Sequence, residues 1–379
     1  MTSLLVTNDF PPTIGGIQSY LWELWRRLPA SETTVMTTSY AGAEEWDRAQ
    51  SFRVVRRRQK VLLPTRGLAR DVDALARELG ADVIFVDPAL PLGLIVPLLR
   101  AAPAVVVLHG AEITVPGRLP TKPLLGRVLR SAAGVVAAGG YPLAEGERAA
   151  GRSLPSLVVA PGIDAARFRP AADRAEQRAA RVALGLDVDA RLVLGASRLV
   201  PRKGFDVLLC ALALLPVDVH LVLVGSGRDR SRLEKLVASR GLGGRVQFLG
   251  RVSEEELPLA HRGADVFAMV CRDRWGGLEA EGFGIVFLEA GASGLACVAG
   301  RSGGSHEAVL DGETGYVVEP RDDNLVATRL LQLLDDPDLR SQMGARARAL
   351  AESVWSYDHR VEPLARLAAG DLSVLSQWR

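Results

Sequence analysis

Val105-Val106-Val107-Leu108 is a short, unbroken run of apolar residues that ends directly at the polar His109. Such a run, without alternation of polar and apolar residues, is typical of a strand buried on both faces of its sheet. Similar runs recur along the whole chain, and helical patterns separate them. They lie at residues 4–6, 83–86, 134–138, 192–194, 220–224, 246–249, 265–268 and 296–299. Buried strands that alternate with helices predict an α/β protein with parallel sheets.

A polar segment interrupts this series between residues 168 and 192. Arg169-Pro170-Ala171-Ala172-Asp173 has the composition of a linker, and a helical pattern follows it at residues 174–184. The chain has 379 residues, which is long for a single hydrophobic core. We therefore predict two Rossmann-like, doubly wound parallel-sheet domains that face each other across a cleft. Their predicted bounds are 1–170 and 171–355, with a C-terminal helix at 356–379 that crosses back to the first domain.

Two glutamates stand eight positions apart in Glu281-Gly-Phe-Gly-Ile-Val-Phe-Leu-Glu289. The N–H groups of Gly284, Ile285 and Val286 would open a helix, and a helix start suits a phosphate because its N–H donors lack partners. Glu289 lies in an apolar run that looks buried, where a carboxylate needs a partner. Two solvated glutamates on a surface loop would be the plainer interpretation. The apolar context favours a ligand site instead.

Three further loops follow predicted strands and contain residues suited to a ligand. Gly15 and Gly16 precede a helical pattern, which allows close approach to a diphosphate but is a weak signal alone. Arg198 and Lys203 bracket a turn that contains a proline, and two cations there would neutralise a diphosphate. Exposed charges on a turn are the alternative. His109 would face the predicted cleft, although a structural histidine is the commoner case.

Several classes of protein are disfavoured by composition and motifs. Three widely spaced cysteines predict no disulfide framework, and the five histidines have no metal-ligand spacing, so we predict no metal site. Gly225-Ser226-Gly227 lacks the third glycine of a dinucleotide fingerprint, which argues against a nicotinamide dehydrogenase. No apolar run is long enough to span a bilayer, and the first residues lack the charged start of a signal peptide. We expect a cytoplasmic protein.

Basic residues mix with leucines and valines in two stretches of the first half. Arg56-Arg57-Arg58-Gln59-Lys60 precedes Val61-Leu62-Leu63, and the second stretch contains Arg118, Lys122, Arg127 and Arg130. Such segments bind an anionic membrane surface, or else form the solvated faces of ordinary helices, and the sequence leaves both interpretations open. Nucleic acid is a poorer partner, because no aromatic stacking residues are interleaved with these charges.

Taken together, these residues resemble a large family of retaining glycosyltransferases that includes bacterial-type glycogen synthases and lipid mannosyltransferases. The resemblance covers essentially the whole chain and rests on the pattern at Glu281 and Glu289, the pair Arg198 and Lys203, and the Gly15-Gly16 loop. A closer similarity is to the actinobacterial phosphatidylinositol mannoside mannosyltransferases. It extends over Thr7–Tyr20, Ser197–Gly204 and Glu281–Ala290.

This resemblance implies a two-domain fold of the GT-B type and a hexosyl transfer with retention at the anomeric carbon. The donor would be GDP-mannose, the acceptor a phosphatidylinositol mannoside or related lipid at the cytoplasmic face of the plasma membrane, and no cofactor would be needed. Catalytic roles are implied for Arg198, Lys203, Glu281 and His109. Nucleotide-sugar binding is implied for Gly15, Gly16, Arg198, Lys203, Glu281, Gly284, Ile285, Val286 and Glu289.

Within these implied roles, Arg198 and Lys203 hold the diphosphate, with Gly16 nearby. Glu281 binds sugar hydroxyls, Glu289 binds the ribose, and His109 lies near the transferred sugar.

Three positions depart from the pattern of that subgroup. Ala111 stands where a histidine is usual, Trp275 where a glycine is usual, and His306 where a proline is usual. These changes leave other substrates open, such as a UDP-sugar with a soluble acceptor. A protein that binds a nucleotide sugar without transferring it, and an epimerase of the same architecture, are weaker alternatives.

Overall fold

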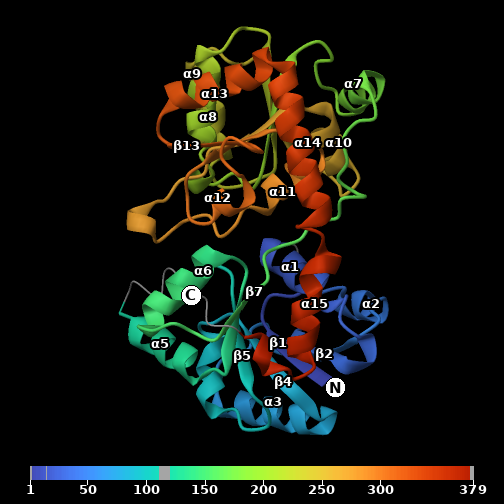
Figure 1. Cartoon of the computed structure of the whole chain (residues 1–379), viewed down its shortest axis with the longest axis vertical. Helices are drawn as coiled ribbons and strands as arrows, with labels where there is room; N and C mark the ends of the chain where they lie inside the picture. Colours follow the sequence, from blue (N-terminus) through green and yellow to red (C-terminus); the bar gives the residue numbers. More distant parts are fainter. Residues whose placement is uncertain (1, 14, 111–119, 376–379) are drawn as a thin grey trace. The chain divides into compact units, whose positions relative to one another are not determined.

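The computed structural model describes residues 2–13, 15–110 and 120–375, and these form two compact α/β units (Figure 1). The first comprises Met1–Pro161 together with Tyr357–Arg379, and the second comprises Gly162–Ser356. Each unit contains one sheet in which every pair of neighbouring strands is parallel. The predicted fold of two Rossmann-like parallel-sheet domains is confirmed.

The boundary between the units lies at Pro161, nine residues earlier than the predicted 170. The intervening segment packs on the second unit, where the Arg348 guanidinium donates to the carbonyls of Ala165 and Phe168, both at 2.7 Å. The Phe168 ring also meets His261 edge-on at 5.3 Å between centroids. These contacts carry the segment into the second unit although its composition is that of a linker.

The sheet of the first unit has seven strands in the order β3-β2-β1-β4-β5-β6-β7. Their bounds are β1 Thr2–Thr7, β2 Thr33–Thr38, β3 Arg53–Arg57, β4 Ala81–Asp87, β5 Ala104–Leu108, β6 Gly134–Ala137 and β7 Ser156–Val158. β2, β3 and β7 were not predicted. β2 is rich in threonine, and β3 and β7 are edge strands, so none of them is a continuous apolar run.

Helices cover both faces of this sheet with separate apolar clusters. One face packs against α3, η2, α5 and α6, and the other packs against α1 and α15. The helical segments of the unit are α1 Gly16–Trp25, η1 Ala30–Glu32, α2 Ala43–Arg48, α3 Arg66–Leu79, η2 Leu92–Leu98, α5 Lys122–Ser131, α6 Gly140–Ala150, α15 Tyr357–Ala368 and η5 Leu372–Val374. The chain therefore returns to its first unit through α15.

The sheet of the second unit has six strands in the order β10-β9-β8-β11-β12-β13. Their bounds are β8 Arg191–Ala196, β9 Val219–Val224, β10 Val246–Gly250, β11 Val266–Met269, β12 Cys297–Gly300 and β13 Gly315–Val318. The helical segments are α7 Arg174–Ala183, η3 Pro201–Lys203, α8 Phe205–Leu214, α9 Arg230–Ser239, α10 Glu256–Gly263, η4 Trp275–Gly277, α11 Ile285–Ala292, α12 Ser305–Ala308, α13 Asp323–Asp335 and α14 Pro337–Ser353. One continuous apolar cluster fills this unit.

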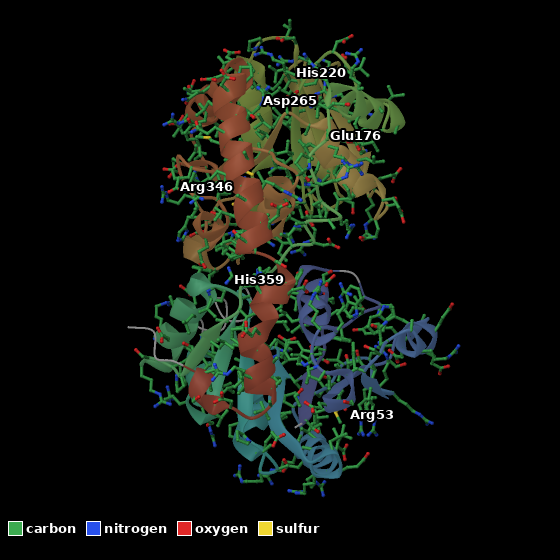
Figure 2. All side chains as sticks on the ribbon, turned by 45° about the vertical axis from the view of Figure 1, so that its right-hand side comes forward. Arg53, Glu176, His220, Asp265, Arg346 and His359 are labelled. Carbon is green, nitrogen blue, oxygen red and sulfur yellow. The ribbon has the colours of Figure 1, made fainter. Side chains whose placement is uncertain are left out.

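The predicted helix at 174–184 is present as α7, which is tied to the sheet by charged side chains. Arg181 donates to the Asp265 carboxylate at 2.9 Å, next to β11, and Glu176 accepts from Arg169 and Arg262 (Figure 2). In both sheets the strand order reverses beside the first strand of the unit. At such a point the loops after two adjacent strands diverge and leave room for a ligand at the carboxyl edge.

Candidate functional site

The loops after β8 and β11 bring two cations onto one buried carboxylate. The Lys203 ammonium lies 2.5 Å from Glu281 Oε2, and Arg202 Nη1 lies 3.1 Å from the same oxygen. Lys203 and Glu281 are only 6% and 8% exposed. Because β8 and β11 are neighbouring parallel strands, residues 78 positions apart meet at one edge of the sheet.

The charge of Glu281 is maintained by these neighbours. Burial alone raises the pKa of this carboxyl, but the attraction of Lys203, Arg202 and Arg198 outweighs burial and leaves the pKa below its usual value. The Glu281 backbone N–H also donates to the Ser302 hydroxyl at 3.1 Å, which fixes the start of the loop. Glu281 is therefore an ionised acceptor held in place from two sides.

Arg198 is exposed at the end of β8, on a loop that two glycines of the next loop support. A Cβ on Gly225 would lie 2.0 Å from the Ser197 carbonyl oxygen, and a Cβ on Gly227 would lie 2.1 Å from the Leu199 carbonyl oxygen. No side chain fits there, so the Gly-Ser-Gly segment allows the close packing of the Arg198 loop. This role explains the incomplete dinucleotide fingerprint.

The start of α11 lies immediately after Glu281. Gly284 caps the helix with a φ of +96°, and a Cβ there would meet the Phe287 ring at 2.6 Å. Within the part of the chain that the structure describes, no acceptor is bonded to the N–H groups of Ile285 and Val286. These donors and the helix dipole make the position favourable for an anion.

Glu289 lies one turn into α11 and is half-buried. Burial raises the pKa of its carboxyl to about 7; the positive charge of Arg167 opposes this rise and the negative charge of Glu254 adds to it. Among the described residues, no donor is hydrogen-bonded to the Glu289 side chain. A carboxylate in this state is suited to accept hydrogen bonds from the hydroxyls of a ligand.

The first unit has a separate polar cluster at the carboxyl ends of β1, β4 and β5. His109 Nε2 lies 2.9 Å from Oδ1 of the buried Asp87, whose Oδ2 accepts from the Thr7 hydroxyl at 2.7 Å. The Tyr20 ring meets His109 edge-on at 5.2 Å. The predicted His109 is thus buried and oriented by a carboxylate. Gly15 caps α1, of which Gly16 is the first residue.

The predicted residues therefore divide between the two units. The structure brings together Arg198, Lys203, Glu281, Gly284, Ile285, Val286 and Glu289 at the carboxyl edge of the second sheet. Gly15, Gly16 and His109 belong to the first unit. Sequence reasoning missed Arg202, Asp87, Thr7 and Ser302. Thr7 and Asp87 are polar residues at the carboxyl ends of apolar strands, and this position could have marked them as candidate site residues.

The basic stretch that begins at Arg56 is only partly exposed. Arg56 is largely buried and pairs with Asp47 at 2.8 Å, and Arg57 pairs with Asp71 at 2.5 Å, because both residues belong to the edge strand β3. The exposed residues are Arg58 and Lys60, with Val61 and Leu63 at 49% and 62% exposure. In the second stretch, Lys122, Arg127 and Arg130 are exposed on α5, whereas Arg118, like Ala111, lies outside the described residues.

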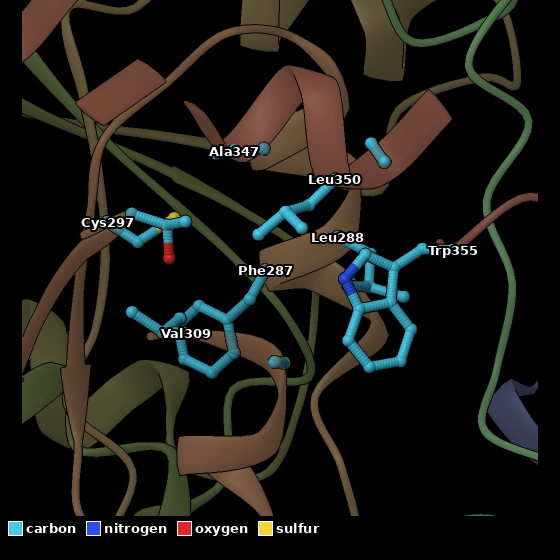
Figure 3. A pocket seen from close by; sticks show the side chains of 11 residues that line it. Phe287, Leu288, Cys297, Val309, Ala347, Leu350 and Trp355 are labelled. Atoms are coloured by element: carbon cyan, nitrogen blue, oxygen red, sulfur yellow. The ribbon is translucent and has the colours of Figure 1, made fainter. Parts of the chain in front are cut away.

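A pocket behind α11 is unsuited to a charged ligand. Figure 3 shows its apolar lining, which includes Phe287, Leu288, Val309, Leu350 and Trp355 and contains no charged side chain. It is a packing gap between α11 and α14.

Within residues 2–13, 15–110 and 120–375, no group of three or more His, Cys, Asp or Glu side chains is placed to hold a metal ion. No helix in the same ranges is both long and apolar enough to cross a membrane.

The fold and the site define a two-domain α/β protein whose second unit carries a cationic cluster and a helix start suited to an anionic ligand. Residues 176–350 match the family described as glycosyl transferases group 1. A GDP-mannose-dependent alpha-(1-6)-phosphatidylinositol monomannoside mannosyltransferase of Mycolicibacterium smegmatis is 39% identical over 97% of this chain and 98% of its own. The chain belongs to the group 1 glycosyl transferases and is a glycosyltransferase.

A further relative agrees with this assignment, and two solved structures are similar in fold. The GDP-mannose-dependent monoacylated alpha-(1-6)-phosphatidylinositol monomannoside mannosyltransferase of Corynebacterium glutamicum is 37% identical over 96% of this chain and 97% of its own. HepE of Anabaena, solved with UDP, has a TM-score of 0.83 over 97% of this chain and 100% of its own at 22% identity. Sucrose-phosphate synthase of Thermosynechococcus elongatus has a TM-score of 0.79 over 97% and 98% at 22% identity. These two structures share the two-domain fold.

Proposed function

We propose that this enzyme transfers mannose from GDP-mannose to a hydroxyl of a phosphatidylinositol mannoside, with retention at the anomeric carbon. The observation that carries the proposal is the cluster of Lys203, Arg202 and Glu281 beside the start of α11. Similarity over nearly the whole chain to mannosyltransferases of this specificity supports the choice of donor and acceptor.

The diphosphate of the donor binds Arg198, Lys203 and the N–H groups of Gly284, Ile285 and Val286. An ammonium has three N–H donors, so Lys203 keeps its contact with Glu281 while it donates to a phosphate oxygen. We add Arg202 to the residues that bind the diphosphate, because its guanidinium donates to the same Glu281 carboxylate as Lys203 does. The charge that develops on the departing diphosphate is then neutralised by groups already in position.

Glu281 and Glu289 bind the two sugars of the donor. Both cations of the cluster contact Glu281 Oε2, and in the described part of the chain no donor is bonded to Oε1. Oε1 accepts a hydrogen bond from a hydroxyl of the transferred mannose. Glu289, which lies one turn into α11, accepts hydrogen bonds from the hydroxyls of the ribose. Its raised pKa makes this contact pH-dependent near neutrality.

In the transfer step the acceptor hydroxyl oxygen bonds to the anomeric carbon on the face that the diphosphate leaves. The bond between that carbon and the phosphate oxygen breaks, and the hydroxyl proton passes to the departing diphosphate. The products are the extended lipid and GDP. Neither glutamate serves as a covalent nucleophile, in contrast to retaining glycosidases, so the rate derives from positioning and charge stabilisation.

The remaining roles of the proposal belong to residues of the first unit. His109, oriented by Asp87, is assigned to the transferred sugar, and Gly15 and Gly16 to the diphosphate. Arg58, Lys60, Val61 and Leu63 form an exposed cationic and apolar surface that suits the anionic headgroups on the cytoplasmic face of the plasma membrane. The enzyme then works as a peripheral protein on its lipid acceptor.

The deciding experiment incubates purified protein with radiolabelled GDP-mannose and vesicles that contain phosphatidylinositol monomannoside. Label in the lipid fraction, at the mobility of the dimannoside, is the expected result. Unlabelled lipid despite measurable GDP-mannose binding would reject the acceptor and retain the donor site. Unlabelled lipid and no donor binding would reject both.

A further inference from the structure

Trp275 is an exposed aromatic residue in a backbone conformation that tryptophan rarely adopts. It is 64% exposed, and its φ of +50° is the only positive φ of a residue other than glycine in the part of the chain that the structure describes. A left-handed conformation is unfavourable for a bulky side chain, and such residues concentrate at functional sites. The indole is held out into solvent by the turn at which it sits.

The turn is held on the donor side of the second unit. Arg274 and Glu279 pair through two backbone hydrogen bonds of 2.9 and 3.3 Å and through a side-chain contact of 2.9 Å. On the other side, Asp273 accepts from the Ser302 hydroxyl at 2.7 Å, and that hydroxyl also accepts from the Glu281 N–H. The turn of Trp275 is therefore linked to Glu281 through Asp273 and Ser302, and its other end, Glu279, lies two residues before Glu281 in the chain.

The surroundings of Trp275 are ionic. The Arg274 guanidinium lies 4.5 Å from the ring centroid on one face of the indole. The other exposed large apolar residues of this unit are Val182 on α7, Val354 after α14, and Leu214 and Val217, which precede β9 and so lie at the opposite, amino edge of the parallel sheet. A single aromatic ring among charges does not form the apolar patch that a membrane anchor requires. It suits a ligand with one apolar face and polar edges.

We propose that Trp275 stacks against a hexose ring of the acceptor and is a specificity-determining residue of the transfer. A hexose has an apolar face of C–H groups for the indole and hydroxyls at its edge for Arg274 and Glu279. The donor is assigned to Arg198, Lys203, Glu281 and the helix α11, and Trp275 belongs to none of these, so its exposed ring is free to contact the second substrate. This inference rests on the proposed function of the site.

The test compares Trp275→Gly, Trp275→Phe and Trp275→Leu by steady-state kinetics with the acceptor varied. Glycine accepts a positive φ without strain, so Trp275→Gly keeps the fold and removes only the ring. It should raise the acceptor KM about tenfold, which is the effect of losing the burial of one indole face. The leucine variant should behave like the glycine variant, and the phenylalanine variant should stay within about threefold of wild type. The affinity for GDP-mannose should be unchanged in all three.

Val217→Ala, at an 82% exposed apolar residue of the same unit, is the control and should change neither constant. A second acceptor, the deacylated water-soluble mannoside, separates a sugar contact from a membrane contact. An acceptor KM that rises with vesicles but not with the soluble mannoside would overturn the inference in favour of a membrane anchor. Unchanged acceptor KM in Trp275→Gly, with wild-type transfer present, would overturn the inference alone. Absence of wild-type transfer to either mannoside would overturn the proposed function and the inference together.

Discussion

Lys203 pairs with the buried carboxylate of Glu281, and we also assign it to the diphosphate of the donor. Removal of its charge should cut turnover by about two to three orders of magnitude, the usual effect of losing one preorganised charge contact. Lys203→Ala is compared with Lys235→Ala, which removes an exposed lysine from α9 of the same unit and should be silent. Turnover is measured at saturating donor and acceptor.

Circular dichroism establishes that both lysine variants are folded, since Lys203→Ala also leaves Glu281 with Arg202 as its main partner. A folded Lys203→Ala enzyme with near wild-type turnover would contradict the assignment of Lys203 to the diphosphate.

Glu289 predicts a pH dependence of stability. Burial raises the pKa of its carboxyl from the usual 4.5 to about 7, so the folded protein binds this proton more tightly than the unfolded chain does. Between about pH 4.5 and 7 the folded state therefore holds more protons, and the free energy of unfolding contributed by this group falls as the pH rises. The loss amounts to about 2 kcal/mol at pH 8, less than the full shift because the side chain is only half-buried.

Glu289→Gln removes this titration. The variant should be more stable than wild type at pH 8 by about the same 2 kcal/mol and equal to it at pH 4. Denaturant unfolding at both pH values measures the difference. A constant difference between the two proteins across this range would show that the carboxyl titrates normally.

At the next level, the turn between η3 and α8 places Lys203, and it requires glycine. Gly204 has a φ of +70°, and a Cβ there would lie 1.7 Å from the Val270 carbonyl oxygen. Gly204→Ala should lower the free energy of unfolding by about 3 kcal/mol or more, because the backbone after β11 or that of η3 must move to relieve the clash. Turnover should fall as well, because the same turn places Lys203.

Gly241→Ala is the matched control, since its φ is +66° and nothing lies within 4 Å of the added Cβ. It should cost only the strain of the left-handed conformation, about 1–2 kcal/mol, and leave turnover unchanged. Denaturant unfolding of both variants gives the comparison. Equal losses of stability would mean that the clash with Val270 is relieved without cost.

For the chain as a whole, α15 contributes to the stability of the first unit but not to that of the second. Tyr357, Leu364, Leu367 and Ala368 are buried in the cluster on the α1 face of the first sheet, and no residue of α15 belongs to the core of the second unit. A chain that ends at Ser356 should lose several kcal/mol from the first unit, because deletion of buried leucines costs about 2–5 kcal/mol each. The second unit should keep its thermal transition and bind GDP-mannose through Arg198, Lys203 and the start of α11, with lower affinity because the contacts assigned to Gly15, Gly16 and His109 are lost.

Calorimetry with and without GDP-mannose distinguishes the two transitions, because a ligand raises only the transition of the unit that binds it. A truncated chain that loses donor binding while both transitions remain would contradict the location of the donor site. A full-length chain in which GDP-mannose raises neither transition would do the same.

Periodicity along the chain was sufficient for the class of fold. Strands of parallel sheets that are covered on both faces are usually rich in apolar residues, and short apolar runs marked β1, β4, β5, β6, β8, β9, β10, β11 and β12. β2, β3, β7 and β13 lack such runs and were not predicted. Three of them, β3, β7 and β13, are edge strands with weaker demands on composition.

Local patterns also marked the residues that we propose for the donor site. Glycines that allow a helix start, and cations directly after a strand, carry their chemical meaning in adjacent residues, and seven of the predicted positions lie at one edge of the second sheet. The unit boundary depended instead on which domain the linker packs against. It rests on hydrogen bonds between Arg348 and carbonyls about 180 positions away.

The fold class and the residues of the candidate site were thus predictable from the order of the residues, since both depend on neighbours in the chain. Pairing of Lys203 and Arg202 with Glu281, orientation of His109 by Asp87 and the removal of Arg56 from the surface by Asp47 needed the folded chain. Each of these is a contact between residues from different loops or elements. Its energy depends on distance and burial, and neither quantity exists until the strands have been placed side by side.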